Sequence, residues 1–209
     1  MYKLFWAPNS GAFAPQILLE EAGAKYELVK LDLDQGDQHN ADFLAINPRG
    51  QVPALQLDDG SILTESAAIM IHLADCHADA GLLPPAGSSQ RAQVYRWLIF
   101  AVANIYEADL RVFYSDLYTS DSNCVESIKQ RGREDLDAAW DLLETELGKG
   151  PYLLGDRYSI IDPYLLMLTG WHEQPAQLMA RCPGLARLCE SVKARKAVQL
   201  IWSQNVPDA

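Results

Sequence analysis

The chain has 209 residues, a formal net charge of −11 at pH 7 and an apolar content of 49%. This length is enough for one large domain or two small ones. The negative charge argues against a nucleic-acid partner, because phosphate binding requires a basic surface. The sequence contains no run of about eighteen apolar residues, so we expect no helix that spans a membrane.

The spacing of the cysteines indicates the cellular compartment of the protein and whether it binds a metal. None of them forms a Cys-x-x-Cys pair or a Cys/His cluster with the spacing of a zinc site. We therefore expect free thiols, a cytoplasmic location and no bound metal. The four cysteines are Cys76, Cys124, Cys182 and Cys189.

The first part of the chain alternates strand and helix patterns. In chain order we predict a strand at 2–7, a helix through 17–22, a strand at 26–31, a short helix at 41–46, strands at 52–57 and 61–63, and a helix at 67–78. The first two strands, separated by a helix, are expected to be parallel. The Asp-Asp-Gly turn between the last two strands predicts a hairpin. This order of elements is that of a thioredoxin-like fold.

The second half of the chain is predicted to be entirely helical. Proline and glycine residues at 81–89 indicate a linker. We therefore expect an α/β domain over 1–80 and an all-helical domain over 90–209. Apolar residues recur at helical spacing in each predicted helix. These helices lie at 90–117, 125–147, 160–171 and 183–193.

Two features near the end of the chain concern folding. Ser159 and Asp162 form a capping box, in its Ser-x-x-Asp form, before a strongly apolar helix that we expect to be buried. After the last predicted helix, the chain continues as a tail that contains Ile201 and Trp202.

One stretch has the residues expected of a receptor for a short peptide. Pro53 removes a backbone donor where a strand should begin, which requires a strand start, an edge or a special peptide geometry. If the Val52–Pro53 bond is cis, the backbone of Val52 is free to pair with an extended peptide. The hydroxyl of Ser66 and the N–H groups of a helix start suit a carboxylate, and Glu65 suits an ammonium group. Together they describe a site for a zwitterionic amino-acid head joined to a short peptide.

The same stretch closely resembles the glutathione-binding segment of glutathione S-transferases, above all bacterial ones, through the residues NPRGQVPAL, DDG and LTES. A later segment, GDRYSIIDPYL, resembles the C-terminal capping motif of that family, so the resemblance covers essentially the whole chain. It implies a cis Val52–Pro53 bond and a thioredoxin-like domain followed by an all-helical one. It also implies a cytoplasmic homodimer that uses glutathione as co-substrate and acts in detoxification.

The resemblance assigns glutathione-binding roles to four residues of this stretch. The backbone of Val52 pairs with the cysteinyl part of glutathione, in a geometry that Pro53 fixes. Glu65 and Ser66 hold the γ-glutamyl end.

Three further residues have less direct binding roles. Gln51 or Arg49 reaches the glycyl carboxylate, although a solvated turn residue is the simpler interpretation of Arg49. By analogy with the family, Asn104 completes the γ-glutamyl site from a partner subunit.

A glutathione transferase must hold the tripeptide thiol as a thiolate, because the thiolate is the nucleophile. Lowering the thiol pKa by one unit requires about 1.4 kcal/mol of preferential thiolate stabilisation, and one hydrogen bond to a charged group supplies about 1.5–3 kcal/mol. One good donor is therefore enough. Our first candidate is Ser10, in the loop after the first strand, and its rival role is to cap the following helix. Asn9 is the second candidate, and the indole of Trp6 is interpreted mainly as a packing group.

The loop that carries Ser10 departs from the bacterial beta-class pattern. In that class, a Pro-Gly-x-Cys-Ser loop places a cysteine where this chain has Gly11 and a serine where it has Ala12, so Cys-dependent redox chemistry is not expected. The loop looks more like that of bacterial members with a Ser-Gly-Asn sequence, which favours a Ser-assisted transferase. Tyr106 falls where the beta class has an active-site histidine, and it is expected either to touch the sulfur or electrophile or to pack in the core.

The second substrate is expected to be a small apolar electrophile bound between the domains, although the same aromatic residues also suit core packing. The helical residues expected to contact it are Tyr106, Leu110, Phe113, Tyr114 and Tyr118. Two alternatives to conjugation remain open. One is another glutathione-dependent reaction, such as isomerisation, dehalogenation or peroxide reduction. The other is a non-catalytic interaction module, against which the intact Val52–Pro53 and Glu65–Ser66 pairs argue.

Overall fold

The computed structural model describes residues 1–206 of the chain, which form two compact units. The first, which we name the sheet unit, comprises Met1–Leu83 and residues 192–206. The second, the helical unit, comprises Pro84–Ser191. One boundary thus lies inside the stretch 81–89. The C-terminal stretch, by contrast, groups with the sheet unit and not with the helical residues to which the sequence analysis assigned it.

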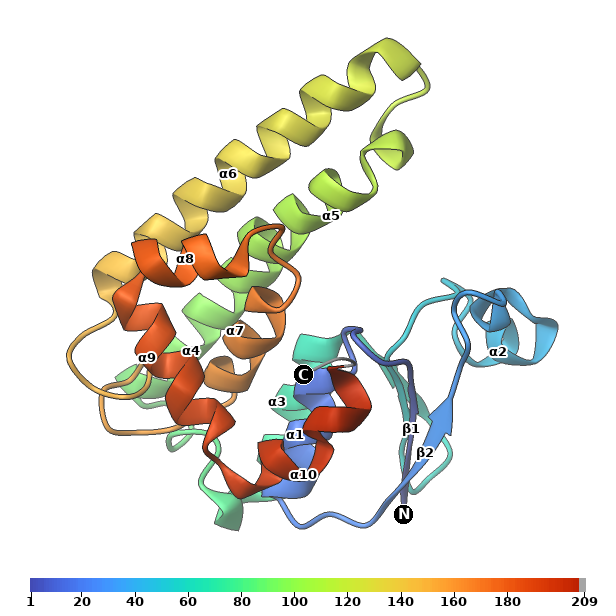
Figure 1. Ribbon diagram of the computed structural model, residues 1–209. Helices are drawn as coiled ribbons and strands as arrows, with labels where there is room; N and C mark the ends of the chain where they lie inside the picture. The colour runs from blue at the N-terminus through green and yellow to red at the C-terminus, as the bar shows by residue number, and fades with distance from the viewer. Residues whose placement is uncertain (207–209) are drawn as a thin grey trace. The chain divides into compact units, whose positions relative to one another are not determined.

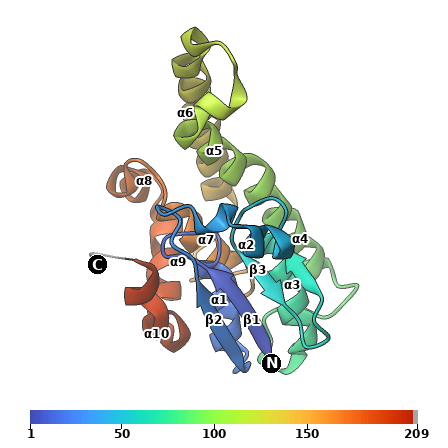
Figure 2. The same cartoon turned by 90° about the vertical axis from the view of Figure 1, so that its right-hand side faces the viewer.

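The sheet unit contains one mixed sheet with the strand order β2-β1-β3-β4. β1 is parallel to β2 and antiparallel to β3, and β3 is antiparallel to β4. Figure 2 shows β2, β1 and β3 side by side. The predicted parallel pair, the hairpin and the thioredoxin-like fold are therefore confirmed. The strands are β1 (Tyr2–Trp6), β2 (Tyr26–Lys30), β3 (Ala54–Gln56) and β4 (Ile62–Thr64).

Helices cover both faces of this sheet (Figure 1). On one face Phe5 of β1 packs against Phe43 of α2, with ring centroids 5.8 Å apart. Since neighbouring residues of a strand point to opposite faces, the fully buried Leu4 points to the other face, where α1 and α3 lie. The helices of the unit are α1 (Phe13–Glu21), α2 (Ala41–Ile46), α3 (Ser66–Cys76) and α10 (Lys196–Asn205), with short 3₁₀ turns η1 (Asp37–His39) and η2 (Ala78–Ala80).

The C-terminal tail of the sequence-based prediction is in fact the helix α10, which packs against α1. The ring of Trp202 meets Phe13 of α1 edge to face, with centroids 5.9 Å apart. Just before α10, the guanidinium of Arg195 donates to the carboxylate of Glu21 at 2.8 Å. The prediction missed this helix because only Ile201 and Trp202 were considered, and a short helix is stabilised mainly by packing that the sequence does not display.

The helical unit departs from its prediction in the first long helix, expected to be continuous over 90–117. The chain instead passes from an α-helix into a π-helical segment, returns to α-helix, and ends in a 3₁₀ turn. The α8 helix was not predicted. The elements are α4 (Ser89–Phe100), η3 (Ala101–Tyr106), α5 (Glu107–Phe113), η4 (Ser115–Tyr118), η5 (Ser122–Cys124), α6 (Val125–Glu146), α7 (Ile161–Thr169), α8 (Pro175–Arg181) and α9 (Pro183–Lys193).

The apolar α7 helix is buried along its whole length, as predicted. At its start, the carboxylate of Asp162 accepts from the N–H of Ser159 at 2.7 Å and from the N–H of Leu153 at 2.8 Å. The first bond is one half of the predicted capping box, and the second fixes the preceding loop to the helix. Within residues 1–206, no helix combines the length and the apolar character needed to cross a bilayer.

Candidate functional site

Strand register brings three candidate segments to one end of the sheet. Ala54 pairs with both Phe5 of β1 and Thr64 of β4. Because both pairings are antiparallel, the chain leaving β1, the chain entering β3 at Pro53 and the chain leaving β4 at Glu65 all lie at that end. The loop after β1, the Gln51–Pro53 stretch and the Glu65–Ser66 pair therefore belong to one site.

The turn before β3 is organised by a buried asparagine that the sequence analysis did not single out. Asn47 is 4% exposed, and its side-chain amide donates to the carbonyl oxygen of Gln51 at 2.6 Å. Its Oδ1 accepts from the N–H of Arg49 at 3.1 Å. An Asn three residues before a Gly is the signal that could have revealed this turn.

Gly50 completes that turn, where a side chain would be both strained and crowded. Its φ is +61°, and a Cβ built on it would lie 2.9 Å from Nδ1 of His39 and 3.0 Å from the carbonyl oxygen of Gln38. His39 is exposed, and its ring closes one side of this turn.

The peptide segment that follows has the conformation implied by the resemblance. The Val52–Pro53 peptide bond is cis. Pro53 is buried, and Val52 packs beside the cluster that contains Phe43 and Ala54. The exposed side chain of Gln51 accepts a hydrogen bond from Nε of Arg49 at 3.0 Å, so these two candidates for a carboxylate contact lie together.

Glu65 and Ser66 stand at the junction of β4 and α3 in an unusual geometry. Glu65 has φ +65° and ψ +110°, a region that costs a non-glycine residue about 1–3 kcal/mol. Its side chain is exposed, whereas Ser66, the first residue of α3, is buried at 8% exposure. The first N–H groups of a helix have no carbonyl partner within it, so this end of α3 suits an anion.

Ser10 lies in the loop between β1 and α1, and its hydroxyl has two partners. It donates to the carbonyl oxygen of Ala7 at 2.6 Å and accepts from the N–H of Ala12 at 3.3 Å. The residue preceding α1 is Ala12, not Ser10, so the expected capping role is replaced by a turn that Ser10 closes before the helix begins. Ser10 is 8% exposed.

Asn9 is held in the left-handed region, with φ +50°, and it is joined to the end of the chain. Its main-chain N–H donates to the main-chain oxygen of Asn205 at 2.9 Å. Asn205 is 1% exposed, and its side chain donates to Oε1 of Gln16 in α1 at 2.8 Å. The expected packing of Trp6 is confirmed by its burial, and its indole nitrogen has no hydrogen-bond partner among residues 1–206.

In the helical unit, the π segment η3 carries both remaining candidates. Asn104 is exposed, and its amide donates to the carbonyl oxygen of Phe100 at 3.2 Å. Tyr106 is partly buried, and its ring meets that of Trp171 edge to face at 5.1 Å. Of the residues expected near an electrophile, three are exposed and so lie outside the unit's core: Phe113, Tyr114 and Tyr118.

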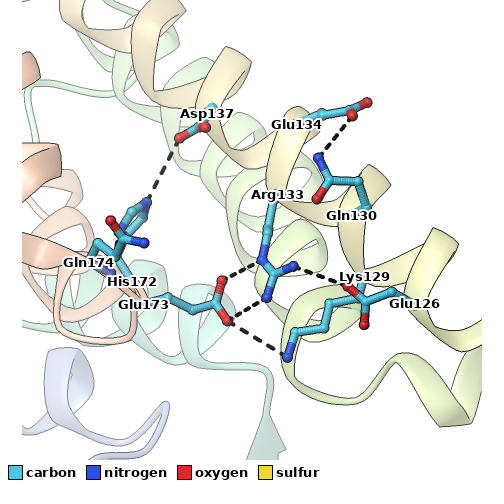
Figure 3. A network of polar contacts seen from close by, with 9 residues as sticks. All are labelled: Glu126, Lys129, Gln130, Arg133, Glu134, Asp137, His172, Glu173 and Gln174. Carbon is cyan, nitrogen blue, oxygen red and sulfur yellow. Dashed lines mark hydrogen bonds and ion pairs between the residues drawn. The ribbon is translucent and has the colours of Figure 1, made fainter.

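The loop that carries Trp171 is tied to α6 by a network of polar contacts (Figure 3). Arg133 of α6 binds both carboxylate oxygens of Glu173, at 2.7 and 3.1 Å. Lys129 lies 3.8 Å from the same carboxylate. These contacts fix the loop whose Trp171 ring packs against Tyr106.

Asp109 of α5 is a buried acid that the sequence analysis missed. It is 3% exposed, and neither carboxylate oxygen has a hydrogen-bond partner among the described residues. Burial, together with the charge of Glu173, raises the pKa of Asp109 to about 7. The available signal was its helical spacing from Ile105 and Val112, which places it on the apolar face.

No group of three or more His, Cys, Asp or Glu side chains in the described part of the chain is arranged to hold a metal ion. The polar groups at the end of the sheet suit a charged organic molecule. They offer an exposed carboxylate at Glu65, a helix start at Ser66 and a loop with a hydroxyl at Ser10.

Comparison with known proteins supplies the family. The family profile of the glutathione S-transferase N-terminal domain matches residues 1–75, and that of the C-terminal domain matches residues 126–191. Glutathione S-transferase GstA of Escherichia coli O157:H7 is 35% identical over 170 residues, 81% of each chain. The disulfide-bond oxidoreductase YfcG of Escherichia coli K12 is 28% identical over 207 residues, 94% of this chain and 92% of its own.

A solved structure gives the same result. A glutathione transferase homologue from Sulfitobacter, with bound glutathione, superposes with a TM-score of 0.90 at 29% identity over 97% of each chain. The names of GstA and of the Sulfitobacter homologue support a transferase. The chain belongs to the glutathione S-transferase family.

Proposed function

We propose that this protein binds glutathione at the end of the sheet where β1, β3 and β4 meet, and transfers its thiolate to small apolar electrophiles. The observation that carries the proposal is the strained backbone of Glu65 directly before the buried Ser66. Strain of this kind is retained where function requires it. The bound glutathione of the Sulfitobacter homologue supports the choice of ligand.

The binding roles follow from chemical complementarity. The carboxylate of Glu65 receives the γ-glutamyl ammonium, and the hydroxyl of Ser66 with the first N–H groups of α3 receives the γ-glutamyl carboxylate. The backbone of Val52 pairs with the cysteinyl residue beside Pro53. Gln51 is assigned to the glycyl carboxylate.

Calorimetry tests this binding mode. Ser66→Ala should weaken glutathione binding by about 1–3 kcal/mol, the cost of a lost hydrogen bond to a charged group. Ser61→Ala is the matched control, because Ser61 is exposed in the β3–β4 turn and its hydroxyl donates to the nearby carboxylate of Asp59, away from the proposed site. Equal affinities for the two variants would place the γ-glutamyl site elsewhere. No binding by the native protein would favour a non-catalytic interaction module.

Activation of the thiol is assigned to Ser10. To donate to the sulfur, its hydroxyl must give up the bond to the carbonyl oxygen of Ala7. A neutral hydrogen bond contributes about 0.5–1.5 kcal/mol and a charged one about 1.5–3 kcal/mol. The exchange therefore favours the thiolate by about 1 kcal/mol, which is close to one pKa unit. Asn9 and Tyr106 are the second and third candidates for this role.

The ultraviolet absorbance of the thiolate, followed against pH in the glutathione complex, measures this directly. The native protein should show a lowered thiol pKa, and Ser10→Ala should return it towards that of free glutathione. Ser115→Ala, a buried serine of the helical unit, should leave it unchanged. If the thiol pKa stayed low in Ser10→Ala, the role would pass to Asn9 or Tyr106. The variants Asn9→Ala and Tyr106→Phe would then show which of these two residues lowers the pKa.

A second candidate reaction is glutathione-dependent redox chemistry, which the relationship to the disulfide-bond oxidoreductase YfcG favours. Product analysis with a panel of electrophiles and of small disulfides distinguishes the two. Conjugates with the electrophiles support the transferase. Reduction of disulfides or peroxides without any conjugation would show that the protein is a glutathione-dependent reductase and not a transferase.

We also propose that the protein acts in detoxification in the cytoplasm as a homodimer. In that dimer Asn104, which is exposed in the single chain, completes the γ-glutamyl site of the partner subunit. Light scattering measures the mass in solution. Asn104→Ala should weaken glutathione binding without changing the mass, and a monomeric native protein would exclude this role.

A further inference from the structure

The four cysteines divide into two buried and two exposed thiols. Cys182 and Cys189 are buried, and burial raises the pKa of the Cys182 thiol. Cys76 and Cys124 are exposed. Since the thiolate is the reactive form and must be reached by its reaction partner, only the exposed pair is open to modification.

Cys76 has a base within reach on its own helix. It is the last residue of α3, and His72 lies four residues earlier, one turn back on the same face. The ring nitrogens of His72 are 3.5 Å (Nε2) and 3.9 Å (Nδ1) from the Cys76 sulfur.

A residue of a second element, Tyr2, lies beside the same end of α3. Tyr2 of β1 lies at the end of α3, where its hydroxyl is 3.4 Å from Nε2 of His77. The pKa of Tyr2 is raised, first by burial and then by the charge and hydrogen bonding of Cys76, with a smaller effect of Asp58. Tyr2 of β1 is therefore part of the surroundings of the Cys76 thiol.

Cys124 has the opposite surroundings. Its sulfur lies 3.7 Å from Oδ2 of Asp121. Hydrogen bonds from Asn123 keep the pKa of Asp121 below its usual value, so this neighbour is a carboxylate at neutral pH. The Cys124 thiol therefore donates to a carboxylate, whereas the Cys76 thiol faces an imidazole. The chain thus contains two exposed thiols with contrasting neighbours.

We propose that Cys76 and His72 form a reactive thiol site that exchanges with small disulfides such as glutathione disulfide. The imidazole of His72 takes the thiol proton, and the Cys76 thiolate attacks one sulfur of the disulfide. The disulfide bond of the reagent breaks while a mixed disulfide forms, and the departing thiolate takes up a proton. One disulfide is consumed, one is formed and one thiol is released.

This site is separate from the proposed glutathione-binding residues and does not depend on them. The probe in the test is therefore bis(2-hydroxyethyl) disulfide, which is uncharged and has no γ-glutamyl group. The intact native protein is incubated with it at pH 7, and the modified fraction of each cysteine is followed by peptide mass spectrometry. Cys76 should react about tenfold faster than Cys124.

Two variants connect the difference in rate to the neighbours of each thiol. His72→Gln should slow Cys76 by about fivefold to tenfold and leave Cys124 unchanged. Asp121→Asn should accelerate Cys124 and leave Cys76 unchanged. Circular dichroism of each variant verifies that it is folded. Rates for the two native thiols within about twofold of each other, or a Cys76 rate unaffected in folded His72→Gln, would overturn the proposal.

Discussion

The main-chain N–H of Asn9 donates a hydrogen bond to the main-chain oxygen of Asn205, 2.9 Å away, and so joins the loop of the proposed thiol-activating residues to the C-terminal helix. The side chain of Asn205 strengthens this junction through Gln16, which is itself fully buried. The conformation of the loop therefore depends on residues near the end of the chain. The sheet alone does not determine it.

Replacing Asn205 should weaken this junction. In Asn205→Ala the buried Oε1 of Gln16 loses the donor of its 2.8 Å hydrogen bond, which should lower the free energy of unfolding by about 1–3 kcal/mol. Urea unfolding measures the loss. Gln199→Ala, an exposed position on the same helix, is the control and should change stability by less than about 0.5 kcal/mol. Equal stabilities of the two variants would show that the junction contributes nothing.

Substitutions at two glycines with nearly the same φ angle distinguish backbone strain from steric clash. Gly23 has φ +59° and Gly50 has φ +61°, but only at Gly50 would a Cβ approach other atoms closely, with His39 Nδ1 at 2.9 Å. Both Gly→Ala variants should lose about 1–2 kcal/mol from the left-handed backbone. Gly50→Ala should lose more in thermal unfolding and should also weaken glutathione binding. If the two variants were equally stable and bound glutathione equally well, the close approach of Gly50 to His39 would have no role in stability or binding.

Glu65 combines strain with a charge, and two substitutions separate them. Glu65→Gly should relieve the backbone at φ +65° and raise stability by about 1 kcal/mol, while it weakens glutathione binding. Glu65→Gln keeps the strain and removes only the charge, so it should weaken binding without a gain in stability. Chemical denaturation and calorimetry provide the two measurements. Glutathione affinity unchanged in both variants would exclude the ammonium contact.

The pKa of Asp109 makes stability depend on pH. It is about 7 in the fold, above its unfolded value of about 3.9. Between these values the folded state binds more protons than the unfolded state. Its contribution to stability is therefore fully present below about pH 4 and is lost as pH rises through about 7, by no more than about 4 kcal/mol.

Asp109→Asn should abolish the loss of stability that ionisation of Asp109 causes as pH rises. The variant should be more stable than the native protein at pH 8, and the gain should shrink towards pH 5. Asp135→Asn is the opposite control: hydrogen bonds from Arg111 and Arg131 lower the pKa of Asp135, so its carboxylate stabilises the fold at pH 8. Thermal unfolding at both pH values measures the two effects. A gain independent of pH in Asp109→Asn would contradict the assignment.

The sequence predicted the sheet unit well because its signals are local. The Asp-Asp-Gly turn between β3 and β4, the alternation in β2 and Pro53 before β3 each act within a few residues. Glu65 and Ser66 were found for the same reason, since they directly precede an apolar helical pattern. What the sequence did not reveal is their common position at one end of the sheet, which depends on the register of Ala54 with its two partner strands.

The missed features depend on contacts and burial that exist only in the folded chain. α10 is stabilised by packing on α1, and Cys76 acquires Tyr2 as a neighbour only when β1 meets the end of α3. Asp109 was overlooked because an acidic residue in a helix is normally expected to be solvated, and only the folded structure shows that it is buried. The hydroxyl bond of Ser10 to Ala7 is likewise a product of the folded loop.

The π segment at Ala101–Tyr106 affects how residues are matched between this chain and its relatives. A π turn contains about one residue more than an α turn, as a single inserted residue would produce. Deleting one residue there should restore a regular helix and leave the helical segments before and after it in nearly their present orientations. In a relative with an unbroken helix, the side chain that occupies the place of Tyr106 in space is therefore displaced by one position in the aligned sequence.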